Sequence, residues 1–115
     1  MYANNVDCSY TIQVSSGSVV KLDWIDFDIE YDVKCGYDYV TIYDVDNTGK
    51  LITSPKFCGS TKPNLQYFQA NKIIVSLNSD ASITGRGFKL KYSTGMKYYH
   101  NITNYHFYIE DYNDI

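Results

Sequence analysis

Residues 35–44 read Cys35-Gly36-Tyr37-Asp38-Tyr39-Val40-Thr41-Ile42-Tyr43-Asp44. Within this stretch, Val40 and Ile42 alternate with polar or amphipathic residues, which is typical of a β-strand that is buried on one face. Asp38 stands where the strand begins, at a position that can face solvent or a metal ion. The function of this stretch therefore depends on which residue Cys35 bonds to and which group Asp38 faces.

Further short apolar runs of this kind occur along the chain. They lie at residues 10–14, 20–29, 51–53, 65–70, 72–78 and 87–92, with turn-forming residues between most of them. The runs 65–70 and 72–78 are expected to be two strands joined by a tight turn. No stretch shows sustained helical periodicity, so the sequence predicts an all-β sandwich.

The run 20–29 contains a change of phase. Its apolar residues occupy even positions up to Trp24 and odd positions from Ile25 onward. Because side chains in a strand alternate with a period of two, the apolar set can stay on one face only if an extra residue is inserted. We therefore expect a β-bulge at Trp24–Ile25.

Length and charge restrict the class of protein. A chain of 115 residues forms one domain, and its net charge of −3 gives no basic stripe, which argues against nucleic acid as a partner. No stretch approaches the roughly 18 apolar residues of a membrane-spanning helix, so membrane insertion is not expected. Residues 1–7 are polar and lack signal-peptide character, so an extracellular location would require a mature form or part of a longer product.

The chain contains three cysteines, at positions 8, 35 and 58, and an odd number leaves one thiol outside any pair within the chain. They form no Cys-x-x-Cys motif or Cys/His cluster, so a zinc site is not expected. Asn101-Ile102-Thr103 is the one sequon for N-glycosylation, which would make the protein a glycoprotein if it is secreted.

Several signatures, taken in order, resemble those of a CUB domain, an extracellular β-sandwich module of complement proteases, tolloid-type metalloproteinases and spermadhesins. The resemblance covers residues 2–93 and rests on Tyr2-Ala-Asn-Asn-Val-Asp-Cys8-Ser-Tyr10-Thr-Ile12, Val20-x-Leu22-x-Trp24-x-x-Phe27-Asp-Ile29-Glu30, Cys35-Gly-Tyr37-Asp38-Tyr-Val40, Phe57-Cys58-Gly59, Asn78-Ser-Asp80-x-Ser82 and Gly87-Phe88. It implies a jelly-roll-like sandwich of two antiparallel sheets and a disulfide between Cys35 and Cys58.

The sequence departs from the family at both ends. CUB domains begin earlier, with one or two strands and a cysteine that pairs with the position of Cys8, so the resemblance implies an N-terminally truncated domain and leaves Cys8 outside a disulfide. We expect the CUB-like domain at residues 1–94. Residues 95–115 form an atypical tail rich in Tyr and Asn. This tail is either a linker or a strand, formed by residues 97–109, that is added to an exposed sheet edge.

The resemblance also extends to the subset of CUB domains that binds calcium. It implies that Glu30, Asp38, Asp80 and Ser82 are metal ligands, with the Tyr2 hydroxyl hydrogen-bonded to the carboxylates. Calcium accepts six to eight oxygen ligands in loose geometry, which carboxylates from separate loops can supply together with carbonyls and water. In this subset a lysine or arginine of a protein partner pairs with the metal-bound acids, and we expect such a partner here.

The expected function is therefore that of a secreted, non-catalytic, calcium-dependent binding module of a larger protein. Both histidines, His100 and His106, lie in the tail, and neither Gly-x-Ser-x-Gly nor His-Glu-x-x-His occurs, so no catalytic residues are expected. Two alternatives stay open at this point. One is glycan binding through outward-facing tyrosines, and the other is a purely structural spacer.

Overall fold

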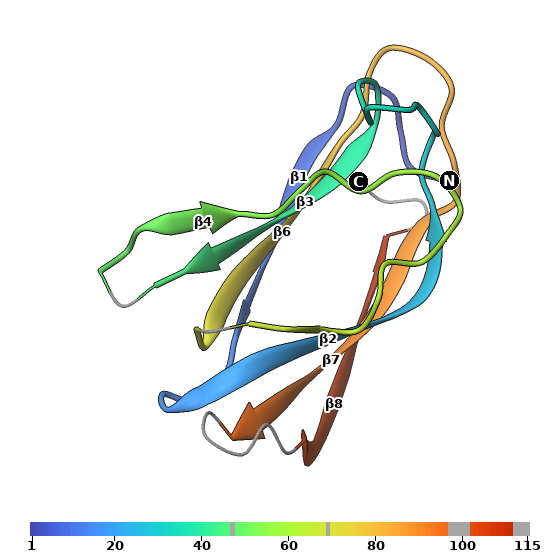
Figure 1. Cartoon of the computed structure of the whole chain (residues 1–115). Coiled ribbons are helices and arrows are strands. Elements are labelled where there is room, and N and C mark those ends of the chain that lie inside the picture. Colours follow the sequence, from blue (N-terminus) through green and yellow to red (C-terminus); the bar gives the residue numbers. More distant parts are fainter. Residues whose placement is uncertain (47, 69, 97–101, 112–115) are drawn as a thin grey trace.

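The protein is represented by a computed structural model that describes residues 1–46, 48–68, 70–96 and 102–111. These residues form eight β-strands in two four-stranded sheets that face each other (Figure 1). Every strand pair is antiparallel, so the predicted all-β sandwich is confirmed. The described ranges hold no helix that could cross a lipid bilayer.

The first sheet, which we call sheet A, has the strand order β1-β6-β3-β4. Its strands are β1 (Asp7–Gln13), β6 (Lys72–Asn78), β3 (Tyr39–Val45) and β4 (Leu51–Thr53). Strand β6 lies between β1 and β3 and pairs with both over its full length or nearly so. Strand β3 is the alternating stretch after Asp38, and its Val40 and Ile42 are buried as predicted.

The second sheet, sheet B, has the strand order β5-β2-β7-β8. Its strands are β5 (Gln66–Tyr67), β2 (Ser18–Asp28), β7 (Gly87–Met96) and β8 (Ile102–Asp111). The pairing of β2 with β7 shifts register between Trp24 and Asp26, which confirms the expected bulge. The extra residue, Ile25, is exposed, whereas Trp24 and Phe27 on either side are buried in the core.

One predicted pairing is wrong. Residues 65–70 and 72–78 were expected to form a hairpin, but only Gln66 and Tyr67 are in a strand, and this strand pairs with Lys21 and Leu22 of β2 in the other sheet. The connection from β5 to β6 therefore crosses between the sheets. The side chain of Gln66 accepts a hydrogen bond from the Trp24 indole N–H at 3.0 Å, which ties β5 to β2.

The tail contributes a strand to the edge of sheet B. Strand β8 pairs antiparallel with β7, from Phe88 opposite Asp111 to Gly95 opposite Ile102. Strand β7 itself continues to Met96, beyond the proposed domain limit at residue 94. That domain limit stays a prediction.

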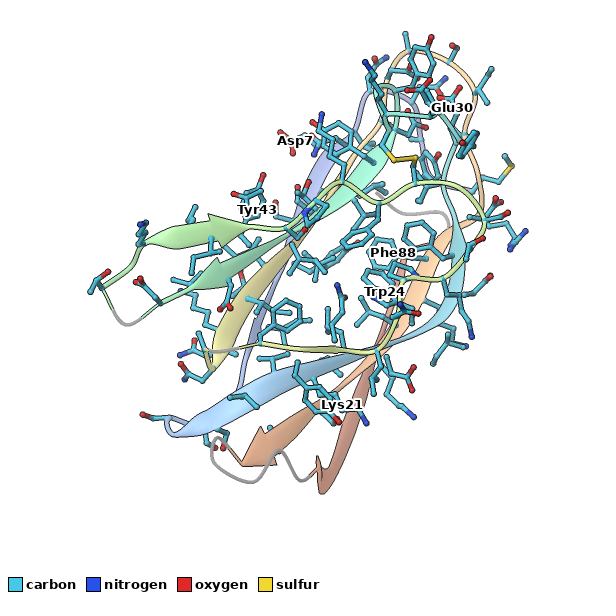
Figure 2. All side chains as sticks on the ribbon, in the orientation of Figure 1. Asp7, Lys21, Trp24, Glu30, Tyr43 and Phe88 are labelled. Carbon is cyan, nitrogen blue, oxygen red and sulfur yellow. A yellow bond between two sulfur atoms is a disulfide. The ribbon has the colours of Figure 1, made fainter. Side chains whose placement is uncertain are left out.

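The core lies between the two sheets (Figure 2). Its aromatic centre is formed by Trp24, Phe27 and Phe88. The Trp24 ring meets the rings of Phe27 and Phe88 edge to face, and the ring centroids are 5.4 Å apart in both pairs. Aliphatic side chains from both sheets surround these rings, and the fully buried ones include Val20, Leu22, Ile42, Ile73, Val75, Leu77 and Leu90. This packing fixes the strand ends from which the loops of the candidate site emerge.

Candidate metal centre

Three chain segments meet at one end of the sandwich (Figure 1). They are the N-terminal residues 1–6, the loop 29–38 between β2 and β3, and the loop 79–86 between β6 and β7. Each carboxylate predicted to bind metal lies within two residues of a strand end: Glu30 follows β2, Asp38 precedes β3, and Asp80 follows β6. The sandwich therefore holds the three acids at one end, although Asp80 is far from the other two in the sequence.

These three side chains form an acidic cluster. One carboxylate oxygen from each of Glu30, Asp38 and Asp80 lies within 4.8 Å of the other two. Asp38 is fully buried, and the other two acids are partly exposed. The structure thus brings together the three carboxylates named from the sequence, while their role as metal ligands stays a prediction.

Tyr2 connects two of these acidic residues from the core side. Its hydroxyl donates a hydrogen bond to Asp38 Oδ2 at 2.6 Å and accepts one from the backbone N–H of Glu30 at 3.1 Å. The ring is only 2% exposed, so the hydroxyl is held in place by the packing around it. Of the expected hydrogen bonds between Tyr2 and the carboxylates, the structure shows the one to Asp38, which helps to orient that side chain.

The loop that carries Asp80 is fastened to the N-terminal segment. The backbone N–H of Asp80 donates to Asp38 Oδ1 at 2.8 Å, and its carbonyl accepts from the N–H of Asn5 at 2.7 Å. Next to it, the Ser79 hydroxyl donates to the carbonyl of Ala3 and accepts from the N–H of Val6. Asn5 has a φ of 55°, a left-handed conformation that asparagine tolerates better than most residues. The Asn4-Asn5 pair was the signal in the sequence that could have identified this turn.

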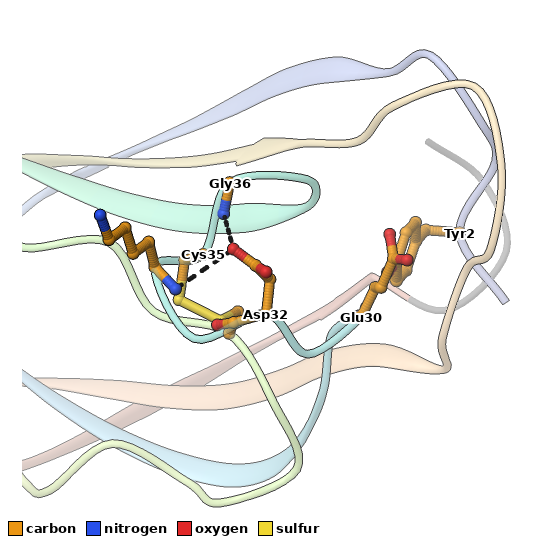
Figure 3. Close-up of a disulfide and its surroundings, with 7 residues drawn as sticks. Tyr2, Glu30, Asp32, Cys35 and Gly36 are labelled. Atoms are coloured by element: carbon orange, nitrogen blue, oxygen red, sulfur yellow. Dashed lines mark hydrogen bonds between the residues drawn. A yellow bond between two sulfur atoms is a disulfide. The ribbon is translucent and has the colours of Figure 1, made fainter.

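The loop 29–38 is held by a disulfide and by backbone hydrogen bonds to the Asp32 carboxylate (Figure 3). Cys35 and Cys58 are bonded, with their Cα atoms 5.6 Å apart, which agrees with the implied disulfide. Within the loop, Asp32 Oδ2 accepts hydrogen bonds from the N–H groups of Lys34 and Gly36 at 3.1 and 2.9 Å. These amide donors lower the pKa of Asp32. The same hydrogen bonds hold the loop backbone between Glu30 and Asp38.

A contact that the sequence did not reveal holds the end of loop 79–86. Arg86 forms two hydrogen bonds to the Asp26 carboxylate, at 3.0 and 3.2 Å, and an ion pair with Asp28 at 3.4 Å. Gly85 lies against the backbone of Asp28 so closely that an added Cβ would be 2.3 Å from the Asp28 carbonyl oxygen. The Gly85 carbonyl accepts from the N–H of Tyr2 at 3.2 Å, which links this contact to the acidic cluster.

The environment of the acidic cluster disfavours its charged form. Burial raises the pKa of Asp38, against the effect of the hydrogen bonds from the Tyr2 hydroxyl and the Asp80 N–H, and the charge of Asp80 raises it further. Desolvation and then the charges of Asp38, Asp80 and Asp32 raise the pKa of Glu30. Burial, followed by the hydrogen bond to Asp38, raises the pKa of Tyr2. The protein alone therefore does not neutralise this group of acids.

The cluster has the properties that a divalent cation requires. Glu30 Oε1 is buried and has no hydrogen-bond partner, which is costly for a carboxylate oxygen. Three carboxylates offer hard, anionic oxygens from separate loops, as calcium prefers. A cation among them would satisfy Glu30 Oε1 and remove the repulsion that raises the pKa values. The residues present therefore fit calcium.

The other residues named from the sequence take different places. Ser82 is exposed, and its backbone N–H donates to Asp80 Oδ1 at 3.2 Å. Its role as a metal ligand stays a prediction. Cys8 is a partly buried thiol on β1, opposite Leu77 of β6. The glycosylation sequon begins at Asn101, which lies outside the described residues.

Comparison with known proteins places this geometry in a family. Among models of protein families, that of the CUB domain matches residues 1–92. The chain belongs to the CUB domain family. Because the match spans the N-terminal segment and both loops of the acidic cluster, the CUB fold is the frame that holds Glu30, Asp38 and Asp80 together.

Relatives of this CUB domain are found among curated proteins and solved structures. The chain is 40% identical over 93 residues to Protein SpAN of Strongylocentrotus purpuratus, covering 79% of this chain and 14% of that protein. The MASP-1 CUB2 domain bound to Ca2+ is 35% identical with a TM-score of 0.67, covering 79% of this chain and 80% of that one. The full extracellular region of zebrafish Gpr126/Adgrg6 is 31% identical with a TM-score of 0.70, covering 81% and 12%.

The lengths of these proteins put the CUB domain in context. The chain spans about a seventh of the length of SpAN and about an eighth of the Gpr126/Adgrg6 region. CUB domains are generally non-catalytic modules, even where, as in Blastula protease 10 of Paracentrotus lividus, the relative is named as a protease. The match to this family therefore concerns a module and not the activity of a whole relative.

Proposed function

We propose that this CUB domain is an extracellular, non-catalytic binding module that uses calcium to dock a protein ligand, as part of a larger protein. Glu30, Asp38 and Asp80 would hold the ion, and a lysine or arginine of the ligand would approach the same acids. The observation that carries the proposal is the buried Glu30 Oε1, which has no hydrogen-bond partner and belongs to a carboxylate that lies beside two others.

Calcium would supply charge neutralisation and rigidity. The protein residues contribute the rest: Tyr2 orients Asp38, and the Asp80 N–H holds the other Asp38 oxygen, so Asp38 keeps its direction whether or not an ion is bound. Because the loops are already fastened by Ser79, by Arg86 and by the disulfide, little further ordering is required when a ligand arrives. Support also comes from the related MASP-1 CUB2 domain, whose solved structure is described as bound to Ca2+.

The charge balance favours a basic ligand group. Three ionised carboxylates and one divalent cation leave a net charge of about −1, and Asp32 adds another negative charge close enough to raise the pKa of Glu30. A lysine or arginine side chain compensates this remainder, whereas an anionic ligand does not. The extracellular location is supported by the related extracellular region of Gpr126/Adgrg6.

Calcium titration by calorimetry, with thermal unfolding in calcium and in chelator, tests the proposal. We expect one binding site and a gain in unfolding free energy of about 2.7 kcal/mol when free calcium is 100 times the dissociation constant. Glu30→Gln should weaken calcium binding at least about tenfold, since it removes one of three charges from a partly exposed position.

A matched variant controls for loss of charge alone. Asp23→Asn removes a carboxylate on β2 that pairs with Lys91 and lies outside the acidic cluster, so calcium affinity should not change. If the wild-type protein gives no heat of binding and the same melting temperature in calcium and chelator, the proposed calcium-dependent function is wrong.

A further inference from the structure

Large apolar side chains stand exposed on the two loops that carry the acidic cluster. Tyr31, Val33 and Tyr37 belong to loop 29–38 and are 72%, 80% and 54% exposed, and Ile83 of loop 79–86 is 67% exposed. We call these four residues the apolar rim. Tyr31 and Tyr37 are the direct chain neighbours of Glu30 and Asp38, and Ile83 is three residues from Asp80, so the rim lies on the same two loops as the cluster.

The loop 29–38 presents its part of the rim from a fixed backbone. The Asp32 carboxylate holds the turn around Val33 through the N–H groups of Lys34 and Gly36, and the Cys35–Cys58 disulfide closes it. Tyr31 lies over Gly59, where an added Cβ would be 3.2 Å from the Tyr31 ring. The backbone that carries Tyr31 and Val33 is therefore held by local contacts, and both side chains are exposed on it.

Ile83 is the most informative member of the rim. It has a φ of 54°, in the left-handed region that glycine and asparagine occupy readily and β-branched residues rarely do. It is also two-thirds exposed, so it gains little from burial in return for this backbone cost. The loop therefore holds an apolar side chain outward, where it is available to a binding partner.

We propose that the apolar rim and the acidic cluster form one docking surface for a protein segment in which a basic side chain is flanked by apolar side chains. This inference rests on the proposed function and specifies the ligand for it. The cation of the ligand would meet the carboxylates, and its apolar neighbours would pack on Val33, Ile83 and the two tyrosines. The charge of the cluster selects this occupant over an anionic membrane, because it repels acidic lipid headgroups even with calcium bound.

Two short peptides provide the probe. The sequences Gly-Leu-Lys-Leu-Gly and Gly-Ser-Lys-Ser-Gly, both with blocked ends, carry the same charge and differ only in the residues beside lysine. Titrations in saturating calcium, followed by NMR chemical shifts, should show the leucine peptide binding about tenfold more tightly to the wild-type protein, a ratio that corresponds to about 1.4 kcal/mol. Equal affinities for the two peptides would overturn the inference.

Substitutions in the rim locate the effect. Val33→Ser and Ile83→Asn should each remove most of the preference for the leucine peptide and leave the affinities for calcium and for the serine peptide unchanged. Because asparagine suits the left-handed backbone, Ile83→Asn should also raise the melting temperature, so that stability and docking change in opposite directions. Leu51→Ser on β4, a site that is 50% exposed, is the control and should change neither.

The remaining outcomes separate the two proposals. If calcium binds but the rim variants retain the peptide preference, the apolar docking surface is wrong and the calcium site stands. If calcium does not bind, the proposed function is wrong, and the inference that rests on it is overturned with it, whatever the peptides do. Binding of the wild-type protein to phosphatidylserine vesicles, lost in Val33→Ser and Ile83→Asn, would assign the rim to a membrane and overturn the docking of a basic protein segment.

Discussion

Tyr2 is a core residue and a site residue at the same time. Its ring is buried with the other apolar side chains of the sandwich, while its hydroxyl joins Asp38 Oδ2 to the N–H of Glu30. A phenylalanine could fill the same space but could not make either hydrogen bond. The Tyr2 hydroxyl oxygen therefore connects Asp38 and Glu30 of the acidic cluster to the core.

The variant Tyr2→Phe isolates this oxygen. Asp38 is fully buried and would lose one of its two donors, so we expect a loss of about 1–3 kcal/mol of unfolding free energy and weaker calcium binding. Thermal melts in chelator and calorimetry with calcium measure the two effects. Tyr31→Phe, at an exposed ring, should change neither, and an unaltered calcium affinity in Tyr2→Phe would show that the hydroxyl does not orient Asp38.

Individual residues of the cluster could be named from the sequence because their order along the chain matched a family pattern. Glu30, Asp38 and Asp80 are indeed together, but nothing in their spacing shows the distance or the burial. Asp26 and Asp28 both form ion pairs with Arg86 in the structure. A contact between residues 60 positions apart depends on how the strands assemble, and local patterns carry no information about it.

At the level of elements, loop 79–86 is defined by how closely it approaches β2. Gly85 lies where a Cβ would be 2.3 Å from the Asp28 carbonyl oxygen and 3.0 Å from its carbon, and a backbone neighbour cannot rotate away as a side chain can. The position therefore requires glycine because of space. Since Gly85 also accepts the hydrogen bond from Tyr2, a shift of this loop would move the N-terminal segment with it.

We therefore expect Gly85→Ala to destabilise the protein by about 1–3 kcal/mol, as overpacking commonly does, and to weaken calcium binding by displacing Asp80. Gly36→Ala provides the comparison, because its added Cβ would meet only the Asp32 side-chain oxygen at 3.2 Å, which can yield. Urea unfolding and calorimetry on both variants measure the difference. Equal losses in the two variants would contradict the account given for Gly85.

The strands show where sequence patterns succeed and fail. Alternation predicted β3 and the bulge in β2 because burial of one face imposes a period of two on the residues themselves. It failed for β5, where two residues pair across to β2 and are held by a side-chain contact with Trp24. A two-residue strand has no periodicity to detect, so its partner could be found only in the assembled sandwich.

For the whole molecule, the acidic cluster links stability to pH. The pKa values of Glu30 and Asp38 are raised in the folded state above their ordinary values of about 4, so the folded protein binds protons more strongly than the unfolded chain. In chelator, stability should therefore increase as the pH falls from about 8 through these raised values. The lowered pKa values of Asp32 and Asp46 act in the opposite direction, but only at pH values below about 5, where the unfolded acids begin to protonate.

Thermal melts between about pH 8 and pH 5 measure this dependence. Calcium should flatten or reverse the profile, since it neutralises the same carboxylates that protons neutralise. Glu30→Gln should reduce the dependence in chelator, because it removes one of the two carboxyl groups whose pKa values are raised. A chelator profile that falls steadily as the pH is lowered over this range would contradict the raised pKa values.

The pairing of β1 with β6 affects how the chain folds during synthesis. Asp7 at the start of β1 lies opposite Asn78 at the end of β6, so β1 is synthesised well before the strand with which it pairs. At about 5–20 residues per second, translation leaves β1 and its apolar Ile12 without this partner for several seconds. Folding dominated by such distant pairings takes milliseconds to seconds once the chain is complete. Because unpaired strands are prone to aggregate, we expect chaperone supply to affect the yield of the protein.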